Sequence, residues 1–207
     1  MSKYIYIFKN TWSSAFQYRA NTFMALLLIF LRLTAEVFFW SMYYKACGRE
    51  IVSGYSYKGM ITYYFVMNLF ANTLAQSTIA NAISGDIKNG FISKYMIMPI
   101  KPAGYYFVKD LAQKLYEMSI GIIAMLPVVL IFHDSIMVYA ELEDMPVILL
   151  CLSMSIVLSF LIFYNISLLT FWFTDISSLF MAVMIITDFL SGGYFPLSIL
   201  PSEIYKF

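Results

Sequence analysis

Long apolar runs alternate with short charged stretches along the whole chain, and this alternation predicts membrane-spanning helices. A helix needs about 20 apolar residues to cross a bilayer. Five runs approach or exceed that length, at residues 21–44, 60–83, 115–132, 146–173 and 176–190. We therefore expect an all-α polytopic membrane protein with five transmembrane helices.

Residues 3–19 have a different pattern, in which apolar side chains share one face of a helix. These side chains recur every three or four residues: Ile5, Phe8, Trp12 and Phe16. Such a helix lies in the headgroup region of a bilayer, with Trp12 and Tyr18 as anchors. Lys3, Lys9 and Arg19 place this interfacial helix, and with it the N-terminus, on the cytoplasmic side.

The loop of residues 84–106, between the second and third runs, mixes positive charges with apolar side chains. Five lysines lie within it or just beyond it: Lys88, Lys94, Lys101, Lys109 and Lys114. A loop this basic is expected to face the cytoplasm. Phe91, Tyr95 and Met98 repeat at helical spacing and predict a short helix, which Pro99 and Pro102 then break. The loop could dock a soluble partner or serve only to fix topology, and charge alone favours the second interpretation.

Polar residues inside the first two runs must face protein or water. Arg32 and Glu36 are four residues apart on one helix face, so they can form an intramembrane ion pair. The pair could gate a substrate path or only fix helix packing. Asn68, Asn72 and Gln76 form a stripe in the second run that could line a path or join helices.

After the fifth run, the apolar segment 191–207 is broken repeatedly. Gly192 and Gly193 permit backbone conformations that other residues resist, and Pro196 and Pro201 each stop a helix. This pattern predicts a re-entrant or interfacial hairpin on the outer side. Asp188, one turn earlier, could cap the broken backbone or contact substrate. We expect a sixth transmembrane helix to be missing, so that residues 1–207 are a single, C-terminally truncated transmembrane domain.

Composition excludes several classes of protein. The chain is 61% hydrophobic and 12% charged, with a mean hydropathy of +0.77, which a soluble domain could not bury. The net charge is +1 and the basic residues lie in separate loops, so no nucleic-acid partner is indicated. Cys47, Cys151 and the single His133 form no metal-ligand spacing, and no catalytic motif occurs. No P-loop sequence is present, so ATP binding through such a loop is not expected in this chain.

Two stretches resemble the membrane subunits of ABC-2 type exporters, which couple transport to a separate ATPase. In the basic loop the resemblance is carried by an apolar and glycine pattern before a Pro-Ile: Ile87, Gly90, Phe91, Tyr95, Pro99 and Ile100. After the fifth run it is carried by a glycine and Phe-Pro break: Gly192, Gly193, Tyr194, Phe195, Pro196 and Pro201. The order of elements is also similar, and the likeness is greatest to small permeases of bacterial export systems.

The resemblance implies that the basic loop contacts an ATP-binding subunit, through Asp86, Lys88, Gly90, Phe91, Tyr95 and Pro99. It also implies that ATP is bound by that partner, with no cofactor in this chain, and that two permeases, identical or different, form one path in the plasma membrane. The acidic residues common before the loop's glycine are reduced here to Asp86. Two alternatives stay open: a membrane-embedded lipid-modifying enzyme using Glu36, Asp188 or His133, and a non-catalytic membrane assembly protein.

Overall fold

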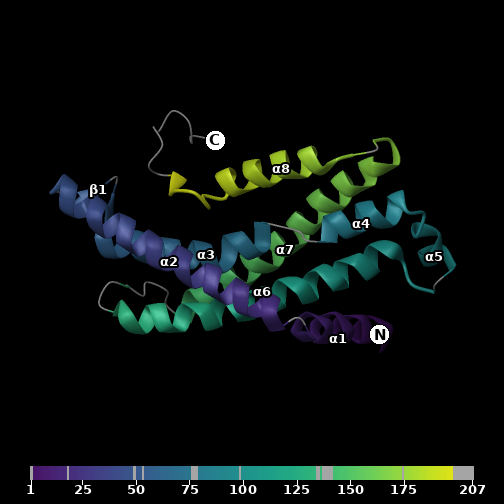
Figure 1. The fold of residues 1–207 in the computed structure, drawn as a ribbon, viewed down its shortest axis with the longest axis horizontal. Helices are drawn as coiled ribbons and strands as arrows, with labels where there is room; N and C mark the ends of the chain where they lie inside the picture. The colour runs from purple at the N-terminus through teal and green to yellow at the C-terminus, as the bar shows by residue number, and fades with distance from the viewer. Residues whose placement is uncertain are drawn as a thin grey trace. The chain divides into compact units, whose positions relative to one another are not determined.

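The computed structural model describes residues 2–17, 19–48, 50–52, 54–75, 79–97, 99–133, 136, 142–173 and 175–197. The α-helices in these residues are α1 (Ser2–Gln17), α2 (Arg19–Cys47), α3 (Tyr57–Ala75), α4 (Ile79–Lys88), α5 (Ile92–Ile97), α6 (Pro102–Ile131), α7 (Met145–Leu168) and α8 (Ser177–Leu190). Short elements complete this set: β1 (Ile51–Val52), β2 (Tyr55–Ser56) and the 3-10 turns η2 (Leu142–Asp144) and η3 (Leu169–Phe171). The described residues are mostly helical, as expected for an all-α membrane protein, and Figure 1 labels α1–α8 and β1.

Three helical stretches among the described residues are long and apolar enough to cross a membrane: Ala20–Cys47, Pro102–Ile131 and Met145–Phe171. The apolar helix Ser177–Leu190 is shorter. The second predicted span, residues 60–83, includes most of α3, which ends at Ala75, and the first part of α4, which begins at Ile79. Gln76 is among the residues outside the description. The total of five spans stays a prediction.

The helix that contains the third predicted span begins before the apolar run does. Helix α6 starts at Pro102, 13 residues before position 115, so Lys109 and Lys114 belong to a helix and not to a loop. Proline suits this first position because its fixed φ fits a helix and its missing N–H would have no helical acceptor there. At 30 residues, α6 is about 45 Å long, which exceeds the bilayer's hydrocarbon core of about 30 Å.

The chain divides into two compact units. The first comprises residues 1–18, 74–117 and 146–187. Within it, Ile79 and Ile83 of α4 pack against Tyr106 of α6 and Phe160 of α7. A second cluster joins the same unit's α4, α7 and α8: Ala80, Phe163, Ile176 and Phe180.

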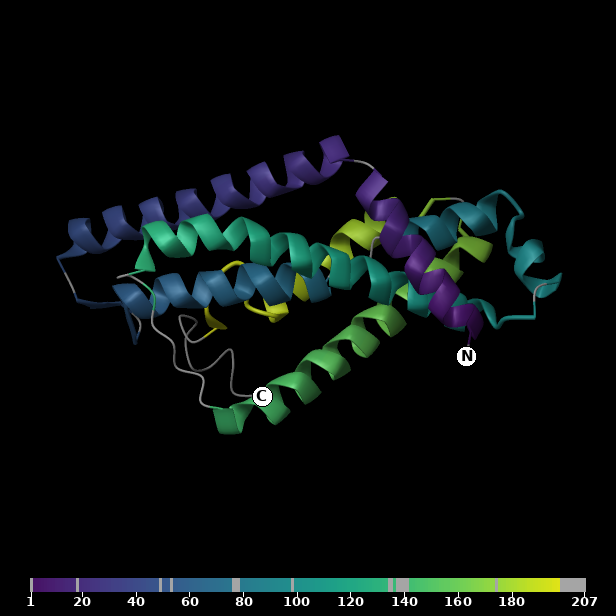
Figure 2. The ribbon, with the colours of Figure 1, turned by 90° about the horizontal axis from the view of Figure 1, so that it is seen from below.

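Helix α1 packs along the beginning of α6 in the same unit, as Figures 1 and 2 show. The Tyr4 ring closely approaches Gly104, where an added Cβ would lie 3.0 Å from the Tyr4 hydroxyl. Three turns further along, the Tyr116 hydroxyl donates a 3.2 Å hydrogen bond to the Ala15 carbonyl. Because position 4 meets 104 and position 15 meets 116, the two helices run in parallel.

The second unit comprises residues 19–73, 118–145 and 188–207. Its core joins α2, α3 and the later part of α6 through five buried side chains: Leu33, Val37, Ile61, Phe65 and Val128. The β1–β2 hairpin between α2 and α3 pairs Ile51 with Ser56. The Tyr44 hydroxyl donates a 2.7 Å hydrogen bond to the Tyr55 carbonyl and holds the hairpin to α2.

Candidate functional site

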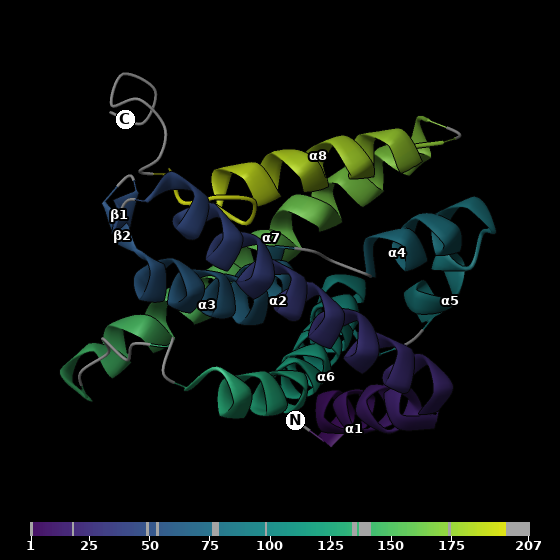
Figure 3. The ribbon, with the colours of Figure 1, turned by 60° about the vertical axis from the view of Figure 1, so that its left-hand side comes forward.

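The basic loop is a compact helix–turn–helix element formed by α4 and α5, which lie next to each other in Figure 3. Helix α4 stops because Gly90 adopts a φ of +73°, a conformation that favours glycine. The Gly90 N–H donates a 3.1 Å hydrogen bond to the Ile87 carbonyl. The short helix predicted from Phe91 and Tyr95 is confirmed as Ile92–Ile97, while Met98 lies outside the described residues.

Asp86 is the centre of a hydrogen-bond network that fixes this loop. Its Oδ2 atom accepts hydrogen bonds from the hydroxyl of Tyr95 at 3.0 Å and from that of Tyr106 at 2.8 Å. The Tyr95 ring lies 5.0 Å from the Tyr105 ring and 5.3 Å from the Tyr106 ring, centroid to centroid. Burial, helped by the nearby Asp86 carboxylate, raises the pKa of the Tyr95 hydroxyl, so it stays protonated and remains a donor.

Other residues of the loop face outward. Phe91 is 57% exposed and Ile97 is 87% exposed, so two apolar side chains project from the tight element that Asp86 holds. Lys88, Gly90 and Pro99 are also exposed. The structure therefore separates the six predicted contact residues into two that bond each other, Asp86 and Tyr95, and four that are accessible.

Lys88 joins the loop to the turn between α7 and α8, since its Nζ atom lies 3.7 Å from Asp175 Oδ1. The same carboxylate oxygen accepts hydrogen bonds from the Ser177 hydroxyl at 2.7 Å and the Ser177 N–H at 3.0 Å. These bonds, followed by the Lys88 charge, hold the pKa of Asp175 below its usual value.

A buried ion pair on α6 was missed by the sequence analysis. Lys114 Nζ lies 3.0 Å from Asp110 Oδ2, and these side chains are only 2% and 1% exposed. Lys114 also donates a hydrogen bond to the Ser159 hydroxyl of α7. The spacing of four residues, the same signal that pairs Arg32 with Glu36, could have revealed it.

Three of the polar residues predicted in the first two spans, Arg32, Glu36 and Asn68, meet in the second unit. Arg32 Nε lies 3.1 Å from Glu36 Oε1, and the Asn68 amide donates a 2.7 Å hydrogen bond to Glu36 Oε2. A groove of about 380 Å³ beside the pair is lined by Arg32, Ala35, Glu36, Phe39, Trp40, Tyr64, Gly193 and Tyr194. The pair thus lies at an open groove as well as in a helix contact.

The chain after α8 turns sharply, as the glycines indicated. Gly192 has a φ of +80°, and the Gly193 and Gly192 N–H groups bond the carbonyls of Asp188 at 2.8 Å and Phe189 at 3.1 Å. This arrangement is a Schellman motif, which ends helices at a left-handed glycine. The α3 residues Tyr63 and Tyr64 hold the turn through hydrogen bonds to two carbonyls.

These bonds run from the Tyr63 hydroxyl to the Gly192 carbonyl at 2.6 Å, and from the Tyr64 hydroxyl to the Tyr194 carbonyl at 2.9 Å. Pro196 is buried, and the Phe195 ring lies 5.5 Å from that of Phe189. Pro201 lies outside the described residues, and the re-entrant path stays a prediction. At this turn, Asp188 accepts the hydrogen bond from the Gly193 N–H through its backbone carbonyl.

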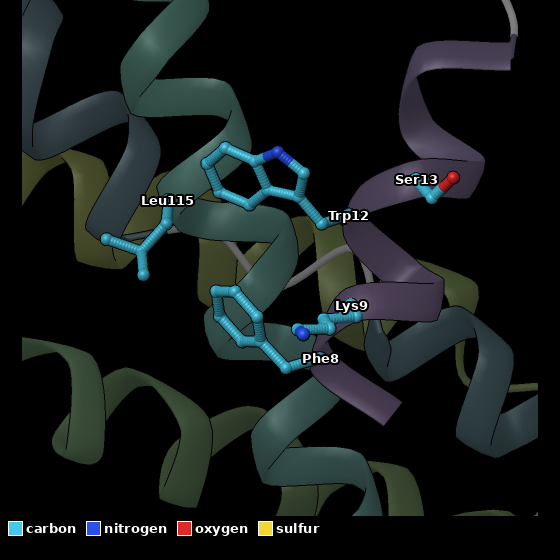
Figure 4. A pocket seen from close by; sticks show the side chains of 5 residues that line it. All are labelled: Phe8, Lys9, Trp12, Ser13 and Leu115. Carbon is cyan, nitrogen blue, oxygen red and sulfur yellow. The ribbon is translucent and has the colours of Figure 1, made fainter. Parts of the chain in front are cut away.

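A third feature is a groove of about 370 Å³ between α1 and α6 in the first unit, lined by Phe8, Lys9, Trp12, Ser13 and Leu115. Figure 4 shows the Phe8 and Trp12 rings extending from α1 toward α6, whereas Ser13 points away. Among the described residues, no group of three or more His, Cys, Asp and Glu side chains is arranged to hold a metal ion.

Long apolar helices, with paired charges held against protein, define a polytopic membrane protein. Residues 30–207 match the family model described as ABC-2 family transporter protein, which is more than half of the chain. The chain therefore belongs to the ABC-2 transporter family, and it is a membrane component of ABC transport. Membership implies an ABC ATPase as a partner. No curated protein and no solved structure matches the chain.

Proposed function

We propose that this chain is the permease subunit of an ATP-driven exporter, and that its α4–α5 loop couples transport to a separate ATPase. The observation that carries the proposal is the architecture of the loop. A network centred on Asp86 ties α5 to α4 and α6, while Phe91 and Ile97 project outward. Exposed apolar side chains on a rigid element are typical of a protein interaction site.

The network gives the loop a mechanical role. Tyr106 lies on α6, which continues from the loop into an apolar span. A force applied at Phe91 would therefore reach α6 through Asp86 instead of being absorbed by a flexible linker. Nucleotide binding can drive transport only if the ATPase binds the two states of the permease with different affinities.

The proposal changes the roles of two predicted contact residues. Asp86 and Tyr95 are positioning residues that shape the loop, because each bonds the other. Phe91 and Ile97 contact the ATPase, with Lys88, Gly90 and Pro99 around them.

In the proposed arrangement the N-terminus and the loop are cytoplasmic and the membrane is the plasma membrane. A second permease, identical or different, completes the path, and ATP is bound only by the partner. The groove beside Arg32 and Glu36 faces this path, since a half-exposed guanidinium in the middle of a span cannot face lipid without cost. Glu36 is held by Arg32 and Asn68, which favours this role over acid–base chemistry on lipid.

The test measures how much ATPase subunit co-purifies with the chain from its native membrane. Phe91→Asp is expected to lower the amount of co-purifying ATPase at least tenfold, because it places a charge in an apolar contact. Ile51→Asp is the matched control, since Ile51 is 63% exposed but lies on the β1–β2 hairpin of the second unit and not on the α4–α5 loop. Equal ATPase recovery from both variants and the parent would contradict the proposal.

A further inference from the structure

We infer that the groove between α1 and α6 is a binding site for one acyl chain of an anionic phospholipid. This inference does not depend on the coupling role of the α4–α5 loop. It rests on the shape, the lining and the charge of the groove in the first unit.

Aromatic side chains of α1 contact α6 on both sides of Phe8 along the helix: Tyr4 approaches Gly104, and Trp12 and Phe16 reach Tyr116. The Trp12 and Phe16 rings pack edge-on against the Tyr116 ring, at centroid distances of 6.1 Å and 5.0 Å. Phe8 lies one turn earlier, stacked on Trp12 at 5.8 Å, and with Leu115 of α6 it lines open space. Figure 4 shows Leu115 on the far side of the two rings.

The lining suits a hydrocarbon chain. Phe8, Trp12 and Leu115 supply apolar walls, and the volume of about 370 Å³ falls within the usual range of about 300–1,000 Å³ for small-ligand sites. Ile5, Tyr6 and Phe16 of α1 remain more than half exposed on the protein. Because such side chains favour the boundary between headgroups and acyl chains, the groove would open toward lipid.

The charge at the groove favours an anionic headgroup. Lys9 lines the groove, and Figure 4 shows its side chain beside that of Phe8. Helix α1 also carries Lys3 and contains no Asp or Glu, so it offers only positive charge to a headgroup. A lysine at an anionic membrane surface contributes about a fivefold preference, the equivalent of about 1 kcal/mol.

The test uses the fluorescence of Trp12 in the full chain after Trp40→Phe and Trp172→Phe remove the other two tryptophans. The protein is placed in phosphatidylcholine vesicles that contain a minor fraction of lipid with brominated acyl chains, which quench a nearby indole. At equal mole fraction, brominated phosphatidylglycerol is expected to quench Trp12 several-fold more effectively than brominated phosphatidylcholine.

Lys9→Gln is expected to reduce that preference about fivefold. Lys3→Gln is the matched control, because it removes the same charge from the same helix outside the groove lining. Equal quenching by both lipids would overturn the inference. Equal effects of the two lysine variants would also overturn it, since only a general surface attraction would then remain.

A second measurement avoids the tryptophan replacements. Leu115→Trp fills the groove with a larger side chain, and native mass spectrometry of the purified chain then counts retained phosphatidylglycerol. The inference predicts one fewer retained lipid than in the parent, and an unchanged count contradicts it.

Discussion

The hydroxyl of Tyr106 donates a 2.8 Å hydrogen bond to Asp86 Oδ2, and this bond ties helix α6 to helix α4. Tyr95 donates to the same oxygen from α5. A single carboxylate oxygen on α4 therefore holds α5 and α6 to α4. In the proposed coupling mechanism, the loop can transmit a conformational change to α6 only while these two hydrogen bonds are intact.

Replacing Asp86 by Ala is expected to destabilise the first unit by about 2–3 kcal/mol, because two hydroxyls lose a charged acceptor. Thermal unfolding of the purified protein in detergent measures the loss. Tyr95→Phe removes one of the two bonds and should produce about half the effect. Glu143→Ala, at an exposed carboxylate elsewhere, is the control. If Asp86→Ala and Glu143→Ala unfold alike, the carboxylate does not organise the loop.

Lys114→Met is expected to cost about 3–5 kcal/mol, since it leaves the buried Asp110 carboxylate without its cation. Lys109→Met, on the same helix but less buried, should cost far less. Adding Asp110→Leu to Lys114→Met should recover most of the stability, because neither charge is then buried. Denaturation of the four proteins in the same detergent compares them, and a double variant less stable than Lys114→Met would refute this account of the pair.

Gly192→Ala should be more damaging than Gly48→Ala. Both glycines have positive φ, which costs other residues about 1–2 kcal/mol. At Gly192 an added Cβ would also lie 2.5 Å from the Tyr63 hydroxyl, whereas Gly48 has open space. The clash is expected to add about 1–3 kcal/mol.

Tyr63→Phe removes the clashing hydroxyl and should restore part of the stability of Gly192→Ala. Unfolding measurements on the two single variants and the double variant test this. Strict additivity of the two substitutions would show that the Tyr63 hydroxyl does not clash with the Cβ added at position 192.

The lowered pKa of Asp175 predicts that the stability of the folded protein depends on pH. The pKa of this carboxyl is lowered in the folded protein, so its contribution to stability is present above the unfolded pKa of about 3.9 and is lost as the pH falls through the folded value. The difference in unfolding free energy between the parent and Asp175→Ala should therefore disappear on acidification from pH 6. A difference that grows toward low pH would contradict the assignment.

Some features of this fold were predictable because they depend on local signals. Helix α1 has a helical apolar repeat, and Gly90 and Gly192 both adopt the left-handed conformation at helix ends. The Arg32 and Glu36 contact follows from their spacing. Each of these features is determined by residues that are close together in the sequence, so the sequence alone was enough to predict them.

Other features depend on tertiary packing, which hydrophobicity does not report. Hydrophobicity marks the predicted span from position 115 but not the 13 residues of α6 before it, because these first three turns are polar enough to resemble a loop, although Pro102 marks a helix start. The sequence pattern groups Lys114 with the basic loop, whereas in the structure it is buried against Asp110 and Ser159. The family resemblance implies a partner contact for Tyr95, and only the structure shows that Asp86 accepts its hydrogen bond.

The most direct test of the central claim is site-specific photo-crosslinking from the α4–α5 loop in native membranes. A benzophenone amino acid would replace Phe91, Ile97, Tyr95 or Ile51, one at a time. The account predicts that positions 91 and 97 crosslink to an ATP-binding-cassette subunit, with a yield that changes when ATP is added, and that positions 95 and 51 do not. Absence of that subunit from the products of 91 and 97, or equal yields from 51, would contradict the coupling role of the loop.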